Sequence, residues 1–114
     1  MGKLDGKKIV FLTADMTHDE ELNYPRYHLM WEGAEVTVAG LSLEQKSRFG
    51  MPLKSDITVD DLDRHDFDAA VIPGGFAPDK LRVSEPVLNF VRKMFSRGRL
   101  IAAICHGPQV LISA

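Results

Sequence analysis

The sequence is poor in cysteine: Cys105 is the only one among 114 residues. One cysteine cannot form a disulfide within the chain, which agrees with a reducing compartment. The amino-terminal residues 1–8 are polar and lead straight into an apolar run, so they lack the apolar core of a secretory signal. We therefore expect a cytoplasmic protein.

Long apolar segments and runs of like charge are also missing. No segment is long enough to span a bilayer, so no membrane partner is predicted. Lys and Arg number 14 against 16 Asp and Glu, and they form no basic stripe that would favour nucleic acid. His65 lies in a polar connector with no cysteine or second histidine at ligand spacing, so neither a metal site nor a cofactor is predicted.

What is present suits one α/β domain over residues 1–114, with 45% hydrophobic content. Strand-like apolar runs alternate with segments of helical pattern, which favours a mostly parallel sheet with helical crossovers. Strands are predicted at 9–13, 35–39, 67–72 and 100–104, with a short one at 55–59, and helices from 17–20 to near 33 and from 84 to 98.

The segments between the predicted strands contain residue patterns that predict helix starts, a hairpin and a short helical turn. Thr17-His18-Asp19-Glu20 has the form of a capping box at the start of the first helix. Pro25 would either kink that helix or mark its true first turn. Residues 45–54 contain a glycine and a proline and predict a small hairpin or a surface excursion, and residues 60–62 predict a single helical turn.

Cys105 stands where the last apolar run ends, directly before His106, Gly107 and Pro108. Glycine and proline here are typical of a tight turn into a helix, and such a strand-to-helix turn pushes its apical side chain out of the sheet. The positive end of the following helix would favour the thiolate, the reactive form of cysteine. Cys105 is therefore a candidate nucleophile, and the alternative is an ordinary buried cysteine in an apolar strand.

A second predicted turn could supply hydrogen-bond donors to the site at Cys105. The run 67–72 ends in Pro73-Gly74-Gly75, which would leave bare backbone N–H groups at the carboxyl edge of the sheet, beside the Cys105 turn. N–H groups of His106 and of the Gly74-Gly75 loop could then stabilise an oxyanion. Asp19, Glu20 and Glu21 are candidates for an acid at this site, the alternative being ordinary charges at a helix amino terminus. His106 need not be the base for Cys105, because adjacent residues on a turn normally point apart.

Three segments of the chain carry a combined pattern: Asp19-Glu20-Glu21-Leu22 with Tyr24-Pro25, Asp68-Ala69-Ala70-Val71-Ile72-Pro73-Gly74-Gly75 with Ala77-Pro78, and Ala103-Ile104-Cys105-His106-Gly107-Pro108-Gln109. In this order they resemble the PfpI branch of the DJ-1/PfpI superfamily, over nearly the whole chain. The resemblance implies a flavodoxin-like three-layer sandwich, assembly into homo-oligomers, and intracellular peptidase, deglycase or glyoxalase activity, with some members acting as redox-responsive chaperones or stress proteins.

The resemblance also implies roles for single residues. Cys105 matches the family nucleophile, His106 the histidine that follows it, and Glu21 the glutamate that hydrogen-bonds the thiol. Asp79 stands where the PfpI branch has a glutamate that orients the histidine of a neighbouring subunit, and it keeps the charge on a side chain one methylene shorter. His18 stands where relatives often have an acid and is a candidate pocket residue.

Relatives of this branch continue past the turn that carries the nucleophile, so the resemblance implies a fold incomplete at its carboxyl terminus, with an exposed apolar face and an unpaired sheet edge. Two functions are expected from Cys105. The first is a cysteine-dependent hydrolase, a peptidase or a deglycase or glyoxalase, that acts on a peptide or small-molecule substrate. The alternative is a non-catalytic redox-sensing stress protein or chaperone in which Cys105 is oxidised.

Overall fold

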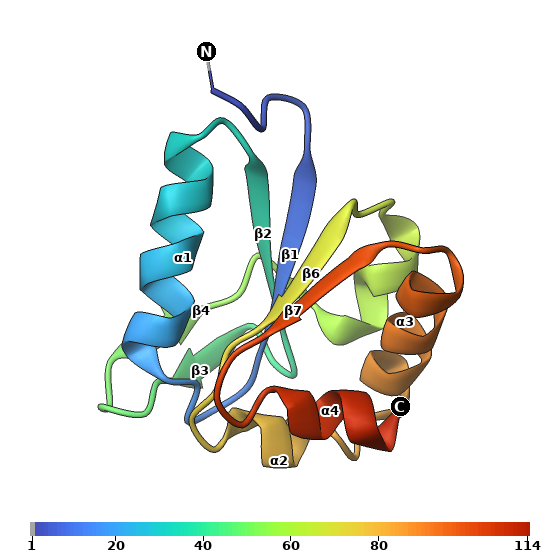
Figure 1. Ribbon diagram of the computed structural model, residues 1–114. Coiled ribbons are helices and arrows are strands. Elements are labelled where there is room, and N and C mark those ends of the chain that lie inside the picture. Colours follow the sequence, from blue (N-terminus) through green and yellow to red (C-terminus); the bar gives the residue numbers. More distant parts are fainter. Residues whose placement is uncertain (1) are drawn as a thin grey trace.

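The computed structural model describes residues 2–114 as a five-stranded parallel sheet with helices on both faces (Figure 1). The strand order is β5-β2-β1-β6-β7, and β3 and β4 form a separate antiparallel hairpin. In chain order the elements are β1 (Lys8–Thr13), α1 (Asp19–Trp31), β2 (Glu35–Gly40), β3 (Glu44–Lys46), β4 (Pro52–Lys54), β5 (Ile57–Thr58), the 3-10 helix η1 (Val59–Arg64), β6 (Ala69–Ile72), α2 (Ala77–Leu81), α3 (Glu85–Ser96), β7 (Leu100–Ala103) and α4 (Pro108–Ser113).

Strand β1 is the centre of the sheet and is apolar on both faces. Val10 and Leu12 belong to one core cluster, together with side chains of η1, α2, α3 and α4. Ile9 and Phe11 point to the other face, where they pack in a second cluster with Leu22 of α1. Alternate residues of one strand therefore fill both interlayer cores, and the predicted three-layer α/β arrangement is confirmed.

Helix α1 begins one residue later than the capping box implies. His18, not Thr17, occupies the N-cap, and its Nδ1 accepts the Glu21 N–H at 3.4 Å. The Thr17 hydroxyl instead donates to the Ala14 carbonyl at 2.7 Å and closes the turn after β1, so the capping-box interpretation was wrong. Pro25 lies inside the helix, which nonetheless continues to Trp31.

Helix α3 buries the stripe formed by Val87, Val91 and Met94, whereas Phe95 is 79% exposed. Ser84 stands at its N-cap position, but the serine side chain makes no capping hydrogen bond, contrary to the expected cap. The hairpin and the short strand β5 are as predicted, η1 is longer than a single turn, and α2 was not predicted.

Strands β5 and β7 are the edges of the sheet within residues 2–114, and β7 pairs only with β6. Leu100 at the start of β7 is 65% exposed and Ile112 of α4 is 77% exposed. No helix in this part of the chain is long and apolar enough to cross a membrane.

Asp68 joins the amino ends of β1 and β6 and gives a pH-dependent prediction. Its Oδ2 accepts the Lys8 N–H at 2.8 Å, and the Arg99 guanidinium lies 3.2 Å from Oδ1. The Lys8 hydrogen bond, helped by nearby cations, lowers the pKa of Asp68 below its ordinary value. A lowered pKa stabilises the fold above the unfolded-state pKa of about 3.9, and that contribution is lost as the pH falls through the lower, folded-state value.

We expect Asp68→Asn to flatten the acid limb of the stability profile, because the variant has no carboxylate to protonate there. Urea unfolding between pH 6 and pH 2.5 measures this loss of stability. Asp60→Asn is the matched control, because Asp60 makes no side-chain hydrogen bond or ion pair within residues 2–114. Equal acid limbs in wild type and Asp68→Asn would contradict the assignment.

Candidate functional site

Three turns that follow β1, β6 and β7 meet at the carboxyl edge of the sheet, next to the start of α1 (Figure 1). The first two are joined by backbone hydrogen bonds: the His18 N–H donates to Gly74 O at 3.1 Å, and the Phe76 N–H donates to Met16 O at 3.1 Å. Parallel strands place their carboxyl ends together, so residues far apart in sequence share this edge.

Cys105 stands at the apex of the turn between β7 and α4 and is exposed. Its φ of 56° lies in the left-handed region, which costs a non-glycine residue about 1–3 kcal/mol and persists only where the surroundings hold it. Here the Ile104 N–H donates to Ile72 O at 3.0 Å, and the Gly107 N–H closes the turn on Ile104 O at 2.8 Å. The thiol is therefore presented to solvent and is not the buried core cysteine of the alternative interpretation.

Gly107 allows this turn to press against the end of β6. A Cβ at this position would clash with the Ile72 carbonyl oxygen and would lie 3.0 Å from the backbone N and O of Ile104. Its φ of −51° is ordinary, so the requirement for glycine is a matter of space rather than of backbone conformation.

Glu21, Gly74 and Cys105 are brought together at the bottom of the site. The Gly74 N–H donates to Glu21 Oε1 at 2.9 Å, across 53 positions of sequence. A Cβ on Gly74 would clash with that carboxylate oxygen and would lie 2.9 Å from Cys105 Cβ. Of the three candidate acids, Glu21 is thus the one whose carboxylate contacts the Gly74 turn, beside Cys105. The Asp19 carboxylate turns instead to Ser47 and Phe49, and Glu20 is exposed.

The predicted oxyanion donors divide into two kinds. The Gly74 N–H already donates to Glu21, whereas the N–H groups of Gly75 and His106 donate no hydrogen bond within residues 2–114. Gly75 has a φ of 82°, and a Cβ there would lie 2.7 Å from the His18 nitrogen. Glycine at 75 is therefore required both by conformation and by space.

The remaining predicted site residues lie around the rim. His18 is half-buried at the start of α1, with its ring edge-on to Phe49 at 5.5 Å. His106 and Asp79 are both exposed, Asp79 in the first turn of α2. Neither residue takes part in an ion pair within the described part of the chain, so a single copy does not bring the two together.

Sequence reasoning missed three rim residues: Arg48, Phe49 and Phe76. Arg48 and Phe49 belong to the turn of the β3–β4 hairpin, and Phe76 follows the diglycine turn. The only available signal was Gly50 and Pro52, which predict a hairpin but not where the hairpin lies relative to the sheet.

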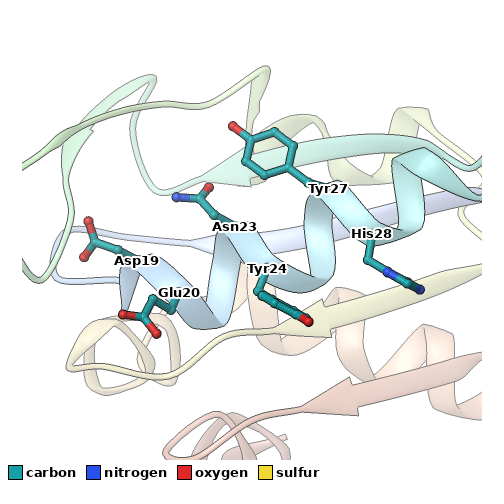
Figure 2. A pocket seen from close by; sticks show the side chains of 6 residues that line it. All are labelled: Asp19, Glu20, Asn23, Tyr24, Tyr27 and His28. Atoms are coloured by element: carbon teal, nitrogen blue, oxygen red, sulfur yellow. The ribbon is translucent and has the colours of Figure 1, made fainter.

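A separate hollow lies along α1 (Figure 2). The hollow contains two of the three candidate acids but not Glu21, Asp79, Cys105 or His106. All six of its lining residues come from this one helix: Asp19, Glu20, Asn23, Tyr24, Tyr27 and His28. Nor do any three His, Cys, Asp or Glu side chains of residues 2–114 gather closely enough to hold a metal ion. The chemically distinctive part of the molecule is therefore the edge that carries Cys105.

The close packing at Gly74 gives a steric prediction. Gly74→Ala should displace the Glu21 and Cys105 side chains, lower the free energy of unfolding by about 1–3 kcal/mol, and slow the reaction of Cys105 with iodoacetamide severalfold. Urea unfolding and intact-mass kinetics measure the two effects. Gly6→Ala is the control for the thiol kinetics: at a φ of 81° the alanine strains the backbone, but its Cβ meets no other atom, so this variant can lose stability without changing the reaction of Cys105. A Gly74→Ala protein with wild-type thiol kinetics would contradict the geometry.

Comparison with known proteins finds relatives in the family that the sequence motifs resemble. A deglycase of Pyrococcus horikoshii, PH1704, is 46% identical over 110 residues, covering 94% of this chain and 65% of the relative. General stress protein 18 of Bacillus subtilis is 35% identical over 96% of this chain and 65% of its own length. The crystal structure of Drosophila melanogaster DJ-1beta superposes with a TM-score of 0.89 at 29% identity, covering 99% of this chain and 60% of that one. The chain thus spans about two thirds of the length of these relatives. Residues 7–114 match the model of the DJ-1/PfpI family, and the chain belongs to that family.

Proposed function

We propose that the protein is a cysteine-dependent hydrolase of the deglycase type, with Cys105 as its nucleophile. The observation that carries the proposal is the exposed thiol at a left-handed backbone position, next to the Glu21–Gly74 hydrogen bond. Support for the deglycase type, in preference to the peptidase type, comes from the relative of that name at 46% identity. The substrate is a small molecule or a peptide that carries a carbonyl adduct, such as an amine modified by methylglyoxal.

In the proposed reaction the bound adduct, a hemiaminal, first releases its amine: the C–N bond breaks, the hydroxyl proton passes to the nitrogen, and an aldehyde remains. The Cys105 thiolate then attacks the aldehyde carbon. A C–S bond forms, and the π-electron pair of the C=O bond moves to oxygen, which becomes an oxyanion. The unengaged N–H groups of Gly75 and His106 are available to stabilise that charge. Glu21 holds the Gly74 turn against the nucleophile and can accept or return a proton at the sulfur. A proton then moves from the sulfur-bearing carbon to the neighbouring ketone carbon, which converts the hemithioacetal into a lactoyl thioester without any external oxidant. Water cleaves the C–S bond of the thioester and restores the thiol, so adduct and water together give the free amine and lactate.

His106 requires a carboxylate that one copy does not supply. In the proposed homo-oligomer, Asp79 of a second copy reaches the exposed His106 ring and fixes its orientation, which a charged hydrogen bond does more firmly than a neutral one. Asp79→Asn should then lower the activity. Asp63→Asn, which replaces an exposed carboxylate paired with Lys93 of α3, should not.

The nucleophile is tested by replacing its sulfur. Cys105→Ser and Cys105→Ala should both abolish the release of free amine from methylglyoxal-modified N-acetyl-lysine, because no other thiol exists in the chain. Amine release and lactate formation are measured together, and circular dichroism verifies the fold. Activity that persists in either variant would rule out the cysteine mechanism.

The acid is tested with a matched pair on α1. Glu21→Gln keeps an oxygen for the Gly74 N–H but removes the charge and the proton-accepting group, so kcat should fall by about 10²-fold or more. Glu20→Gln, at the adjacent exposed position, should leave kcat unchanged. Equal kcat values in the two variants would remove Glu21 from the mechanism.

The second candidate is a redox-sensing stress protein. It is favoured by the exposure of Cys105 together with the likeness to General stress protein 18. In this function peroxide oxidises the thiolate to a sulfenic acid, with water leaving, and a second peroxide gives the sulfinic acid. Mild peroxide should then add one or two oxygen masses at Cys105 and alter the ability of the protein to prevent aggregation of an unfolded client. Unchanged holdase activity after oxidation would exclude this function.

A further inference from the structure

The turn of the β3–β4 hairpin is fixed firmly beside the Cys105 edge. The Arg48 N–H donates to Thr17 O at 2.8 Å, and the Phe49 N–H donates to Asp19 Oδ1 at 3.1 Å. The Ser47 hydroxyl donates to the other oxygen of Asp19. These bonds attach the turn to the first residues of α1, so its side chains have a defined position relative to the site.

The Arg48 guanidinium is held between two aromatic rings. Its Cζ lies 5.8 Å from the ring centroid of Phe49 and 5.2 Å from that of Phe76, distances at which a cation is attracted to the ring face. Arg48 itself forms no ion pair within residues 2–114. Stacking against ring faces leaves the N–H edge of the planar guanidinium available for hydrogen bonds.

The distance between this cation and the nucleophile is limited by the contacts and the chain between them. Phe76 follows Gly75 directly, and the preceding Gly74 contacts the Cys105 side chain. The Cα atoms of Gly74 and Phe76 are at most about 7 Å apart, and the Cys105 side chain, the Phe76 side chain and the 5.2 Å from the Phe76 ring to Arg48 Cζ add to that span. The guanidinium therefore lies at most about 20 Å from the sulfur, and an extended modified amino acid or a nucleotide spans much of that distance.

Three carboxylates around the hairpin turn and the start of α1 accept hydrogen bonds from other groups. Both carboxylate oxygens of Asp19 accept hydrogen bonds from the hairpin turn, Glu21 accepts the Gly74 N–H, and Asp15 Oδ1 accepts the Lys46 N–H at 2.9 Å. None of these carboxylates forms an ion pair with Arg48. Their negative charges remain, but the Arg48 guanidinium has no direct carboxylate partner within residues 2–114.

We propose that Arg48 is a specificity-determining residue that binds an oxyanion of the substrate, a carboxylate or a phosphate, while the carbonyl of the same molecule lies at Cys105. The guanidinium presents two parallel N–H donors to two oxygens, a geometry that an ammonium or an amide does not reproduce. The Phe49 and Phe76 rings restrict the rotation of the side chain. The part of this inference that concerns substrate preference rests on the proposed function. Recognition of an anion by Arg48 can be tested without turnover.

The first experiment needs no catalysis. The sole cysteine is alkylated in parallel with iodoacetate, an anion, and with iodoacetamide, which is neutral. Intact-mass measurements give the two alkylation rates at low and at high salt, and the ratio of the iodoacetate rate to the iodoacetamide rate is compared between variants. Arg48→Gln should lower the iodoacetate rate about two- to threefold at low ionic strength and leave the iodoacetamide rate unchanged. Arg48→Lys should restore the ratio, because the charge is kept. Arg64→Gln removes a cation from η1, which precedes β6, and should have no effect.

The second experiment uses matched substrates. Methylglyoxal-modified lysine blocked at its α-amine is offered with a free carboxylate and as its neutral amide, and a modified guanine nucleotide is offered beside its nucleoside. Arg48→Gln and Arg48→Lys should both raise KM for the anionic member of a pair by about tenfold, with kcat and the neutral member unchanged, since lysine lacks the bidentate donor. The pair that responds identifies carboxylate or phosphate as the bound group.

The outcomes of these two experiments test anion recognition by Arg48 and the proposed deglycase function separately. An unchanged alkylation ratio in Arg48→Gln would overturn anion recognition by Arg48, and an equal loss for charged and neutral substrates would reduce Arg48 to a packing role. A shifted alkylation ratio in a protein that turns over none of the adducts would support the anion site while contradicting the proposed deglycase function.

Discussion

The contact between the Cys105 turn and the end of β6 is the constraint on which the rest of the site depends. It is made by backbone: Ile104 donates to Ile72, and neither Gly74 nor Gly107 has room for a Cβ. Backbone packed this closely leaves few alternatives for the dihedral angles at the apex, which explains how a cysteine is held at a φ of 56°. The exposed position of the thiol follows from that conformation.

The parallel sheet then decides which groups meet the thiol. Because β1 and β6 are neighbours, the turns after them lie side by side, and Glu21 from α1 can accept a hydrogen bond from Gly74. Met16 is the other non-glycine residue with a positive φ in residues 2–114, and it lies in the turn after β1. Both unusual backbone positions thus occur at the same edge, as is common where local strain supports function.

Much of this could be predicted from sequence because strand and helix signals are local. The alternation of apolar runs with helical segments, and the glycines after 67–72, were sufficient to predict β1, β2, β6 and β7 and to bring the diglycine turn beside Cys105. The helix start at His18 was missed because Thr17 satisfies the same pattern but hydrogen-bonds backward to Ala14. Helix α2 is only five residues long and carries no periodic signal.

The rim residues could not be predicted for a different reason. Arg48 and Phe49 belong to a hairpin outside the main sheet, and its position depends on hydrogen bonds to Thr17 and Asp19. Those contacts are tertiary, and no spacing in the chain encodes them. Likewise, Asp79 and His106 form no ion pair within one copy, and the contact proposed between them is an intermolecular one.

The turn of the β3–β4 hairpin is also a separate segment from the turn between β7 and α4 that carries Cys105. It is attached to the rest of the molecule at its two strands and at the start of α1, and none of its residues packs into either apolar cluster except Leu53 of β4. Exchange of residues at its tip would therefore leave the thiol's backbone undisturbed. The tip of the hairpin and the cysteine turn can in this way be varied independently by mutation, because the hydrogen bonds that hold them go to different residues.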